Sequence, residues 1–353
     1  MKTSRIARIT AALAVFGLAA AWIGTIPVPA SAQETAPPRL GLPIDCHFGV
    51  SCWLVHLVDL DSGPGIADYA CGGHTYDGHK GTDIAIQDGA AMERGIPVLA
   101  SAAGVVKAKR DGMEDKMPDK AFRDTKKDLY CGNGIVIDHG GGWETQYCHM
   151  RRGSVAVKPG DKVARGQKLG LVGHSGFASF PHIHLSVRHR GRPIDPFLGL
   201  ATPEAGKVRT SCGTVPEALW TNAATKALAR PLTEIFNAGF AAEKPKHRAI
   251  RGGLYHAKAL SRRSPVLIFW AETWWVRAGD RMQVRIAGPE GETVVEHAST
   301  LDKDQPIRMV FAGTKKPGLF WPPGTYVGTA RLSRTGDGKT MNFDIRREVV
   351  IRD

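Results

Sequence analysis

Two histidines spaced two residues apart are the first feature of this sequence that could do chemistry. His182 and His184 alternate with Ile183 and Leu185, which is the pattern of a strand. A strand places both imidazoles on one face, roughly 7 Å apart along the backbone. Two rings at that spacing can share one metal ion, or one can bind the ion while the other moves a proton.

A second pair, His79 and Asp83, lies upstream in the segment Tyr76–Asp83. On a straight strand the two side chains would be roughly 13 Å apart, whereas metal–nitrogen bonds are about 2 Å long. Gly78 and Gly81 disfavour a helix and predict a bent segment that brings the two side chains together. Two histidines, one aspartate and a water in the fourth position are typical of a catalytic zinc site rather than a structural one.

Taken together, the motifs of this region resemble peptidase family M23, the LytM- and lysostaphin-type cell-wall endopeptidases. The resemblance covers about residues 71–198 and follows the family's order. It lies in His79-Lys-Gly-Thr-Asp83, Gly132-Asn-Gly-Ile-Val-Ile-Asp-His139, Tyr147-Cys-His-Met150, Val157-Lys-Pro-Gly-Asp-Lys-Val163 and Pro181-His-Ile-His184. The zincin signature His-Glu-x-x-His does not occur in the sequence, so that class of metalloprotease does not match.

The resemblance implies one zinc ion held by His79, Asp83 and His184, with His149 and His182 as a catalytic pair. It also implies a β-rich catalytic domain with an open groove, which hydrolyses peptide bonds in peptidoglycan stem or cross-link peptides.

Two further residues are candidates for lining the groove. Tyr76 precedes His79 by three residues, and His174 lies in a glycine-containing loop before the His-x-His strand. We expect His56 and His74 to be surface or packing residues. The charged insertion between Lys109 and Tyr130 has two interpretations, either a wall of the groove or a solvated loop.

Two other function classes compete with the zinc endopeptidase. A catalytically silent protein of the same fold would bind cell wall or activate another hydrolase, but such relatives usually lack ligands and all five positions are filled here. A lipoyl- or biotinyl-type carrier is suggested by Asp119-Lys-Ala121 and by the turn at Pro159–Val163. In such carriers the turn precedes the lysine, whereas here it follows, so the carrier is disfavoured.

The first residues predict an exported protein. Lys2, Arg5 and Arg8 precede an apolar run and the small-x-small site Ala30-Ser-Ala32, which indicates a signal peptide over residues 1–32. We expect the mature chain to be periplasmic or secreted and to have no membrane span. The formal net charge of +13 suits an anionic wall or membrane surface. No nucleic-acid motif or basic cluster accompanies that charge, so nucleic acid is not an expected partner.

Six cysteines in an exported chain predict disulfides. Cys131 and Cys148 flank one predicted hairpin whose turn is centred near Gly140, so cross-strand pairing would place them opposite each other. The other four cysteines leave three connectivities open; they are Cys46, Cys52, Cys71 and Cys212.

The predicted fold class is mostly β throughout. Residues 33–70 are read as a linker and lead-in segment, and residues 71–200 as the catalytic domain of short antiparallel strands. Residues 213–353 are read as a short helix over 215–230 followed by an immunoglobulin-like sandwich. The large aromatic residues of this last part either form the sandwich core, which is favoured, or form a carbohydrate-binding face, through which it would contact wall or protein; they are Trp270, Trp274, Trp275, Phe320 and Trp321.

Overall fold

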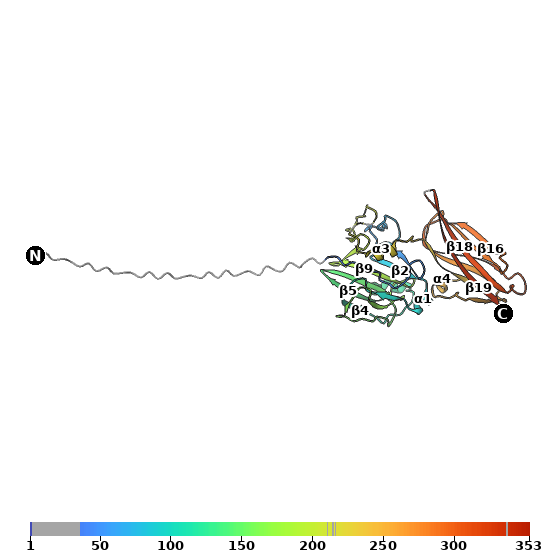
Figure 1. Cartoon of the computed structure of the whole chain (residues 1–353), viewed down its shortest axis with the longest axis horizontal. Coiled ribbons are helices and arrows are strands. Elements are labelled where there is room, and N and C mark those ends of the chain that lie inside the picture. Colours follow the sequence, from blue (N-terminus) through green and yellow to red (C-terminus); the bar gives the residue numbers. More distant parts are fainter. Residues whose placement is uncertain (2–35, 210, 214, 216, 337) are drawn as a thin grey trace. The chain divides into compact units, whose positions relative to one another are not determined.

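The computed structural model describes Met1 and residues 36–209, 211–213, 215, 217–336 and 338–353. The predicted signal peptide and its cleavage site therefore lie outside the described residues, apart from Met1. All elements belong to one compact unit spanning Thr35–Asp353 (Figure 1). Within the described part of the chain, no helix combines the length and the apolar character needed to cross a bilayer.

A nine-stranded antiparallel sheet forms the first part of this unit. Seven strands run in the order β1-β2-β9-β6-β5-β4-β7, while β10 pairs with β9 and with β11. Their bounds are β1 (Cys52–His56), β2 (Thr82–Ile86), β4 (Gly104–Arg110), β5 (Asn133–Gly140), β6 (Trp143–Met150), β7 (Lys162–Val163), β9 (His182–His189), β10 (Arg192–Asp195) and β11 (Leu200–Ala201). A separate pair is formed by β3 (Pro97–Leu99) and β8 (Lys168–Leu171). The mostly β, antiparallel fold predicted from the sequence is confirmed.

The core beneath this sheet extends beyond the predicted catalytic domain. Ile183 and Leu185 of β9 are fully buried, as the alternation of that strand predicts. Leu40, Ile44 and Trp220 belong to the same core cluster, although they lie outside residues 71–200. The main chain of Leu40 also exchanges hydrogen bonds with Leu219 and Thr221, both 2.8 Å long. Segments on both sides of the 71–200 region thus complete its packing.

The helices are short. They are α1 (Gly89–Arg94), α2 (Lys120–Thr125), the 3₁₀ turn η1 (Lys127–Leu129), α3 (Asn222–Leu228) and α4 (His247–Arg251). The helix expected over 215–230 begins later, because the Thr221 side chain caps it by accepting from the Ala224 N–H.

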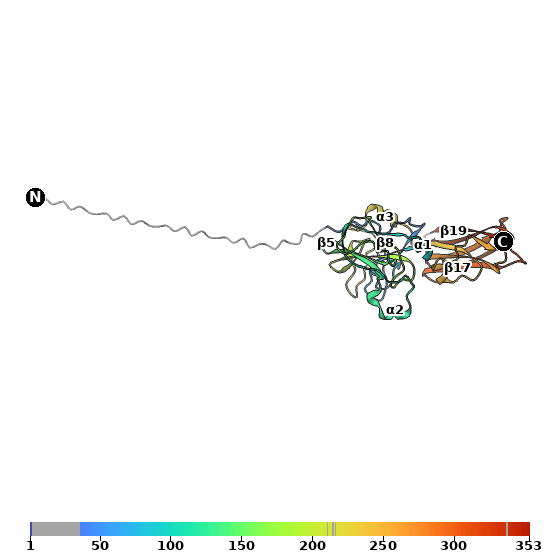
Figure 2. The same cartoon turned by 90° about the horizontal axis from the view of Figure 1, so that it is seen from below.

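The charged insertion between Lys109 and Tyr130 carries α2, which Figure 2 labels. Its residues line most of a hollow of about 670 Å³ that also touches Gly176 and Arg248. None of the five candidate site residues lines this hollow, so both interpretations of the insertion stay open.

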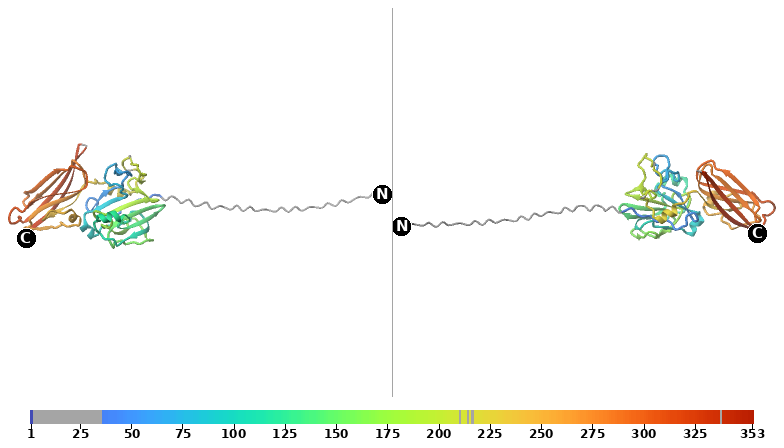
Figure 3. Two further views of the ribbon diagram at one scale, coloured as in Figure 1. Left: turned by 180° about the vertical axis from the view of Figure 1, so that it is seen from behind. Right: turned by 45° about the horizontal axis from the view of Figure 1, so that its top comes forward.

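Two packed sheets follow in the C-terminal half. One contains β12 (Glu234–Ala241), β14 (Val266–Val276) and β17 (Gln305–Lys315). The other contains β13 (Ala259–Ser261), β15 (Arg281–Ala287), β16 (Thr293–Thr300), β18 (Gly324–Gly336) and β19 (Lys339–Arg352). The long paired strands β18 and β19 are the red arrows of Figure 3. Phe240 and Phe269 of the first sheet share a core with Tyr326 and Leu332 of the second, so this half is a β-sandwich.

The tryptophans of the sandwich are mostly core residues. Trp270, Trp274 and Trp321 are all at most 2% exposed. Trp274 packs with Phe236, and both belong to a cluster with Trp53 of β1. This burial agrees with the favoured core interpretation and leaves these three rings out of reach of a carbohydrate. Trp53 and Val55 of β1, the edge strand of the nine-stranded sheet, pack in this cluster.

Three disulfides cross-link the unit. Cys131–Cys148, the pair expected across the hairpin, is among them. Of the three connectivities left open for the other four cysteines, the structure has Cys46–Cys52 and Cys71–Cys212.

Candidate active site

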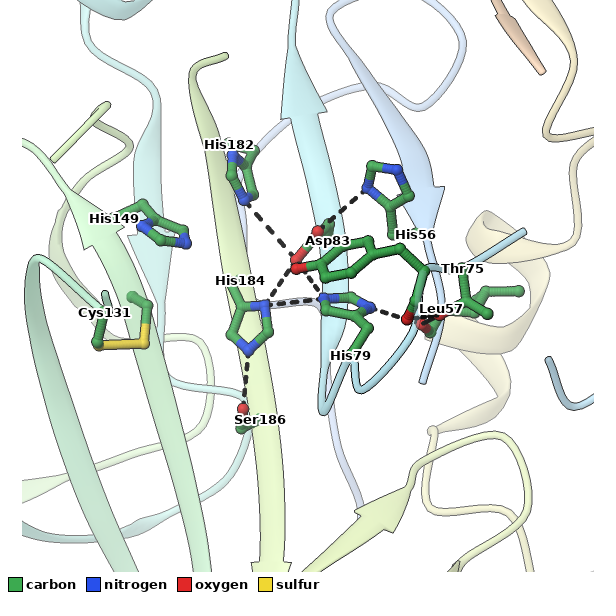
Figure 4. Close-up of polar contacts among 12 residues, drawn as sticks. His56, Leu57, Thr75, His79, Asp83, Cys131, His149, His182, His184 and Ser186 are labelled. Atoms are coloured by element: carbon green, nitrogen blue, oxygen red, sulfur yellow. Dashed lines mark hydrogen bonds and ion pairs between the residues drawn. A yellow bond between two sulfur atoms is a disulfide. The ribbon is translucent and has the colours of Figure 1, made fainter. Parts of the chain in front are cut away.

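Three neighbouring strands bring the candidate residues together. Asp83 on β2 lies opposite His184 on β9, and His184 lies opposite Cys148, the residue before His149, on β6. The carboxylate oxygen Oδ1 of Asp83 is 2.7 Å from Nδ1 of His184 and 3.2 Å from Nε2 of His79. The nitrogens of the two histidines are 3.1 Å apart. Figure 4 shows all three side chains pointing to one spot.

The segment before β2 is bent where its glycines lie. Gly78 has φ +73°, a left-handed conformation that glycine adopts without strain. Gly81 has no room for a side chain, because a Cβ there would come within 2.5 Å of Nε2 of His184. Asp59 stabilises the bend, because its Oδ2 accepts the N–H of Gly78 at 2.9 Å. These contacts place His79 beside Asp83, although the two are four residues apart.

Backbone carbonyls fix the orientation of three rings. The Nδ1 atoms of His79, His149 and His182 lie 2.6–2.8 Å from the carbonyl oxygens of Leu57, Ser175 and Phe180 respectively. A carbonyl oxygen can only accept, so each Nδ1 carries the proton. In the neutral rings Nε2 is then unprotonated, and it is the atom left to bind a metal ion or to accept a proton.

A β-bulge directs His149 into the site. Between β5 and β6 the register shifts, so that three steps from Tyr147 to Met150 face two steps from Ile135 to Asn133. His149 occupies the bulge with φ +62°, which is uncommon for a residue with a side chain. Its ring centroid lies 4.5 Å from that of His182. The bulge therefore places a second imidazole next to the His-x-His strand.

The cluster of His79, Asp83 and His184 suits a metal ion. All three potential ligand atoms lie within 4.8 Å of one another. Tetrahedral zinc with bonds of about 2.1 Å would place its ligand atoms roughly 3.4 Å apart, slightly wider than the distances here. In the neutral ring of His79, Nε2 is unprotonated and faces a nitrogen of His184 and a carboxylate oxygen of Asp83. A cation between the three atoms could bind all of them. Ser186 Oγ lies 2.9 Å from the outer nitrogen of His184 and orients that ring.

Comparisons with known proteins match the same part of the chain. Residues 77–196 match Peptidase family M23. The chain is 37% identical over 117 residues to peptidoglycan DD-endopeptidase ShyA of Vibrio cholerae serotype O1, covering 33% of this chain and 22% of ShyA. It is 34% identical over 132 residues to DD-carboxypeptidase/endopeptidase Mpg of Neisseria meningitidis serogroup B, covering 37% of this chain and 25% of Mpg. A crystal structure of a zinc-containing peptidase from Vibrio cholerae aligns with TM-score 0.30 and 27% identity, over 46% of this chain and 39% of that one.

Residues 77–196 form an M23 peptidase domain. The matches span about a quarter of the length of these curated relatives, so the activity of the whole protein does not follow from them.

Charge and burial set the protonation states in the M23 domain. Burial alone would raise the pKa of Asp83, but the neighbouring His79, His182 and His184 hold it well below its usual value. Burial opposes a charge on His79, yet the adjacent Asp83 raises the pKa of that ring overall. For His182 burial prevails and lowers the pKa to about 4.

Burial likewise lowers the pKa of His149 well below its usual value, and the nearby His182 and His184 lower it further. At neutral pH the site thus combines an anionic Asp83 with two neutral histidines, His149 and His182.

The two candidate groove residues occupy different surroundings. Tyr76 is half exposed and its ring packs 4.4 Å from that of His79, so it lies at the rim of the site. His174 is held within its own loop, where its Nε2 bonds the carbonyl oxygen of Ala178 and its N–H donates to Asp115. Whether either residue contacts a substrate remains a prediction.

The sequence did not single out His56, which the structure places beside the cluster. Its Nδ1 lies 3.2 Å from Oδ2 of Asp83. His74, grouped with it as a surface or packing residue, instead bonds Asp68 at 3.1 Å. The signal for His56 in the sequence was weak: it is the single polar residue of the strand Cys52-Trp-Leu-Val-His56.

Proposed function

We propose that this protein is an exported zinc-dependent endopeptidase that hydrolyses peptide bonds in peptidoglycan stem or cross-link peptides. The observation that carries the proposal is the convergence of five side chains inside the M23 domain. His79, Asp83 and His184 form one cluster, and His149 and His182 flank it. The relatives named above as peptidoglycan endopeptidases support the choice of substrate class.

His79, Asp83 and His184 would hold the zinc ion, with Nε2, Oδ1 and Nδ1 as the ligand atoms. Two neutral nitrogens and one carboxylate oxygen are a common catalytic zinc set that leaves a coordination position open. Zinc bound there would supply a Lewis acid that lowers the pKa of a coordinated water to about 7 and polarises a peptide carbonyl.

His149 and His182 would move the protons. Both rings are neutral at pH 7 and keep Nδ1 protonated, so each presents an unprotonated Nε2. One Nε2 can accept the proton of the attacking water, and a protonated ring can stabilise the oxyanion or donate to the leaving amine nitrogen. Two histidines with centroids 4.5 Å apart allow these steps to be divided between them.

Export and the wall environment fit this chemistry. Three disulfides are compatible with an oxidising compartment, which favours a periplasmic or secreted protein. Without the three basic residues of the signal peptide the formal net charge is 13 − 3 = +10, which favours attraction to an anionic wall.

The direct test is mass spectrometry of purified peptidoglycan after incubation with the mature protein. The expected result is release of fragments with a new amine and a new carboxyl group at a peptide bond. A chelator should stop the release and added zinc should restore it. The His182→Ala variant, which keeps the proposed ligands, serves as the matched control for contaminating hydrolases.

The alternative of a catalytically silent wall-binding protein makes the opposite prediction. Zinc-loaded wild-type protein would then bind purified wall without cleaving any peptide bond, and the proposal would be wrong.

A further inference from the structure

His56 occupies a position between the metal cluster and the C-terminal sandwich. On one side its Nδ1 is 3.2 Å from Oδ2 of Asp83. On the other side its ring packs edge-on against Trp275 of β14, with the centroids 5.6 Å apart. The His56 side chain is only 12% exposed.

The two oxygens of Asp83 have different partners. Oδ1 faces His79 and His184, and Oδ2 faces His56. The last torsion of an aspartate side chain is soft, so a carboxylate held at one oxygen only can rotate. A donor on Oδ2 removes that freedom and keeps Oδ1 directed at the two histidines. Hydrogen-bond partners of metal ligands commonly act in this way.

Trp275 is itself fixed by both halves of the protein. Its indole Nε1 donates to the carbonyl oxygen of Val55, the residue before His56, at 2.5 Å. Its own carbonyl oxygen accepts from Thr233 at 2.7 Å and from Arg334 at 2.9 Å. Arg334 in turn pairs with the buried Asp280 at 2.7 Å. The backbone of Trp275 has φ +50°, an uncommon conformation that these bonds maintain.

We propose that His56 is a positioning residue for the Asp83 carboxylate, and that Trp275 of the C-terminal sandwich holds His56 in place. This inference rests on the proposed zinc site. It gives the sandwich a definite role, because the sandwich then supports the metal centre through its contacts with β1. The sandwich and the M23 domain would form one catalytic unit.

Three substitutions of His56 separate its hydrogen bond from its packing, all in the full mature chain. His56→Phe keeps an aromatic ring but loses the donor. His56→Asn loses the ring but can present an amide N–H close to the position of Nδ1. His56→Ala loses both. His74→Asn is the matched control, because His74 contacts the same Trp275 ring at 5.0 Å but bonds Asp68 rather than Asp83.

The primary measurement is zinc affinity by competition with a chromogenic chelator, with peptidoglycan cleavage as the second. We expect His56→Phe and His56→Ala to weaken zinc binding 10- to 100-fold, the usual effect of removing such a partner. His56→Asn should recover most of the affinity, and His74→Asn should equal wild type. If His56→Phe binds zinc as tightly as wild type, the positioning role is wrong. It is also wrong if the affinity of His56→Phe exceeds that of His56→Asn, because packing of the ring would then matter more than the hydrogen bond.

The part played by Trp275 is tested by a double-mutant cycle. Trp275→Ala alone should weaken zinc binding in the same direction as His56→Phe. Combined with His56→Phe it should add little, because both changes release the same carboxylate. Fully additive losses would overturn the role of Trp275. Thermal unfolding of each apo-protein identifies any variant that has lost its fold, and Trp275→Phe, which keeps a ring at that position, then replaces Trp275→Ala.

The outcome also distinguishes this inference from the proposed function. If the wild-type protein binds no zinc, the proposed function and the inference fail together. If the wild type binds zinc and cleaves wall peptides while all His56 variants match it, only the inference fails.

Discussion

The main-chain N–H of His149 donates to the carbonyl oxygen of Cys131 at 2.8 Å, and Cys131 is disulfide-bonded to the residue just before His149. Two links, one covalent and one a hydrogen bond, therefore join the segment just before β5 to the bulge of β6. Figure 4 shows the disulfide next to His149. We expect both links to help hold the left-handed backbone of His149, and with it the position of the ring beside His182.

Removing this disulfide should reduce turnover while leaving zinc bound. In a Cys131→Ala/Cys148→Ala double variant we expect a loss of rate approaching the 10²–10⁴ that one positioned acid–base group contributes. We also expect a loss of about 3 kcal/mol of stability from the chain entropy of a short loop. Zinc content, cleavage rate and urea unfolding test the three expectations. The Cys46→Ala/Cys52→Ala variant loses a bond remote from β6 and should retain its rate; equal losses in both variants would contradict the prediction.

Alanine substitutions should divide the five site residues into two groups. Without His79, Asp83 or His184 a proposed ligand is missing, so zinc content and activity should fall together. Without His149 or His182 three ligands remain, so zinc should stay bound while the rate drops by about 10²–10⁴. Elemental analysis beside peptidoglycan cleavage distinguishes the groups. Loss of metal from His182→Ala as complete as from His184→Ala would show that the roles are wrongly assigned.

Two glycines in one motif should respond differently to alanine. Gly81→Ala would drive a methyl group to within 2.5 Å of the His184 ring, so zinc affinity should fall at least tenfold. Gly78→Ala meets no described atom within 4 Å but must adopt φ +73°, at a cost of roughly 1–2 kcal/mol. It should lower the midpoint of unfolding and leave the affinity for zinc unchanged. Chelator competition and thermal unfolding of both variants test the contrast, and similar zinc affinities would refute it.

Asp195, a buried carboxyl group outside the active site, should make the free energy of unfolding depend on pH. Burial raises its pKa to about 7, although its Oδ1 accepts the N–H groups of Phe197 and Leu198. In the unfolded chain the carboxyl ionises near its reference pKa of about 3.9. Between those values the folded state holds a proton that the unfolded state has released, so stability should fall as pH rises from about 4 to about 7.

The Asp195→Asn variant removes this titration. Relative to it, wild type should lose up to about 4 kcal/mol of stability across that range, given about 1.36 kcal/mol per pKa unit, and the difference should be constant above pH 8. Urea unfolding of the two proteins from pH 4 to pH 8 provides the comparison. Parallel stability curves would mean that the carboxyl is not protonated in the folded state.

The sequence predicted the parts of the site that depend on spacing. His182 and His184 follow the alternation of a strand, and the glycines around His79 indicated a bend. Residues brought in by tertiary packing gave weaker signals. The bulge at His149 arises from a register shift between β5 and β6. Such a shift depends on the pairing of two strands and cannot be predicted from the local sequence of either. His56 reads as an ordinary packing residue until the position of Asp83 is known.

The fold shows the same limit. In strands such as β9 and β15 apolar and polar residues alternate, and these strands were predicted. Strand β12 was missed because it is buried on both faces from Ile235 to Ala241 and so has no polar alternation, and because it contains Gly239. The extra core residues around Leu40 and Trp220 come from segments that carry no family motif. The disulfide partners of Cys71 and Cys46 could not be chosen, because several pairings are equally compatible with the sequence.

The Cys71–Cys212 disulfide closes a covalent ring of chain around residues 77–196. A protease that cuts once anywhere inside this ring produces two pieces that stay joined. On a gel without reductant the nicked protein would migrate near the intact one, and the break would appear only after reduction. In a compartment shared with other hydrolases, a single nick in an exposed loop of the peptidase domain would not release either half, and the strands bearing the site histidines could stay paired.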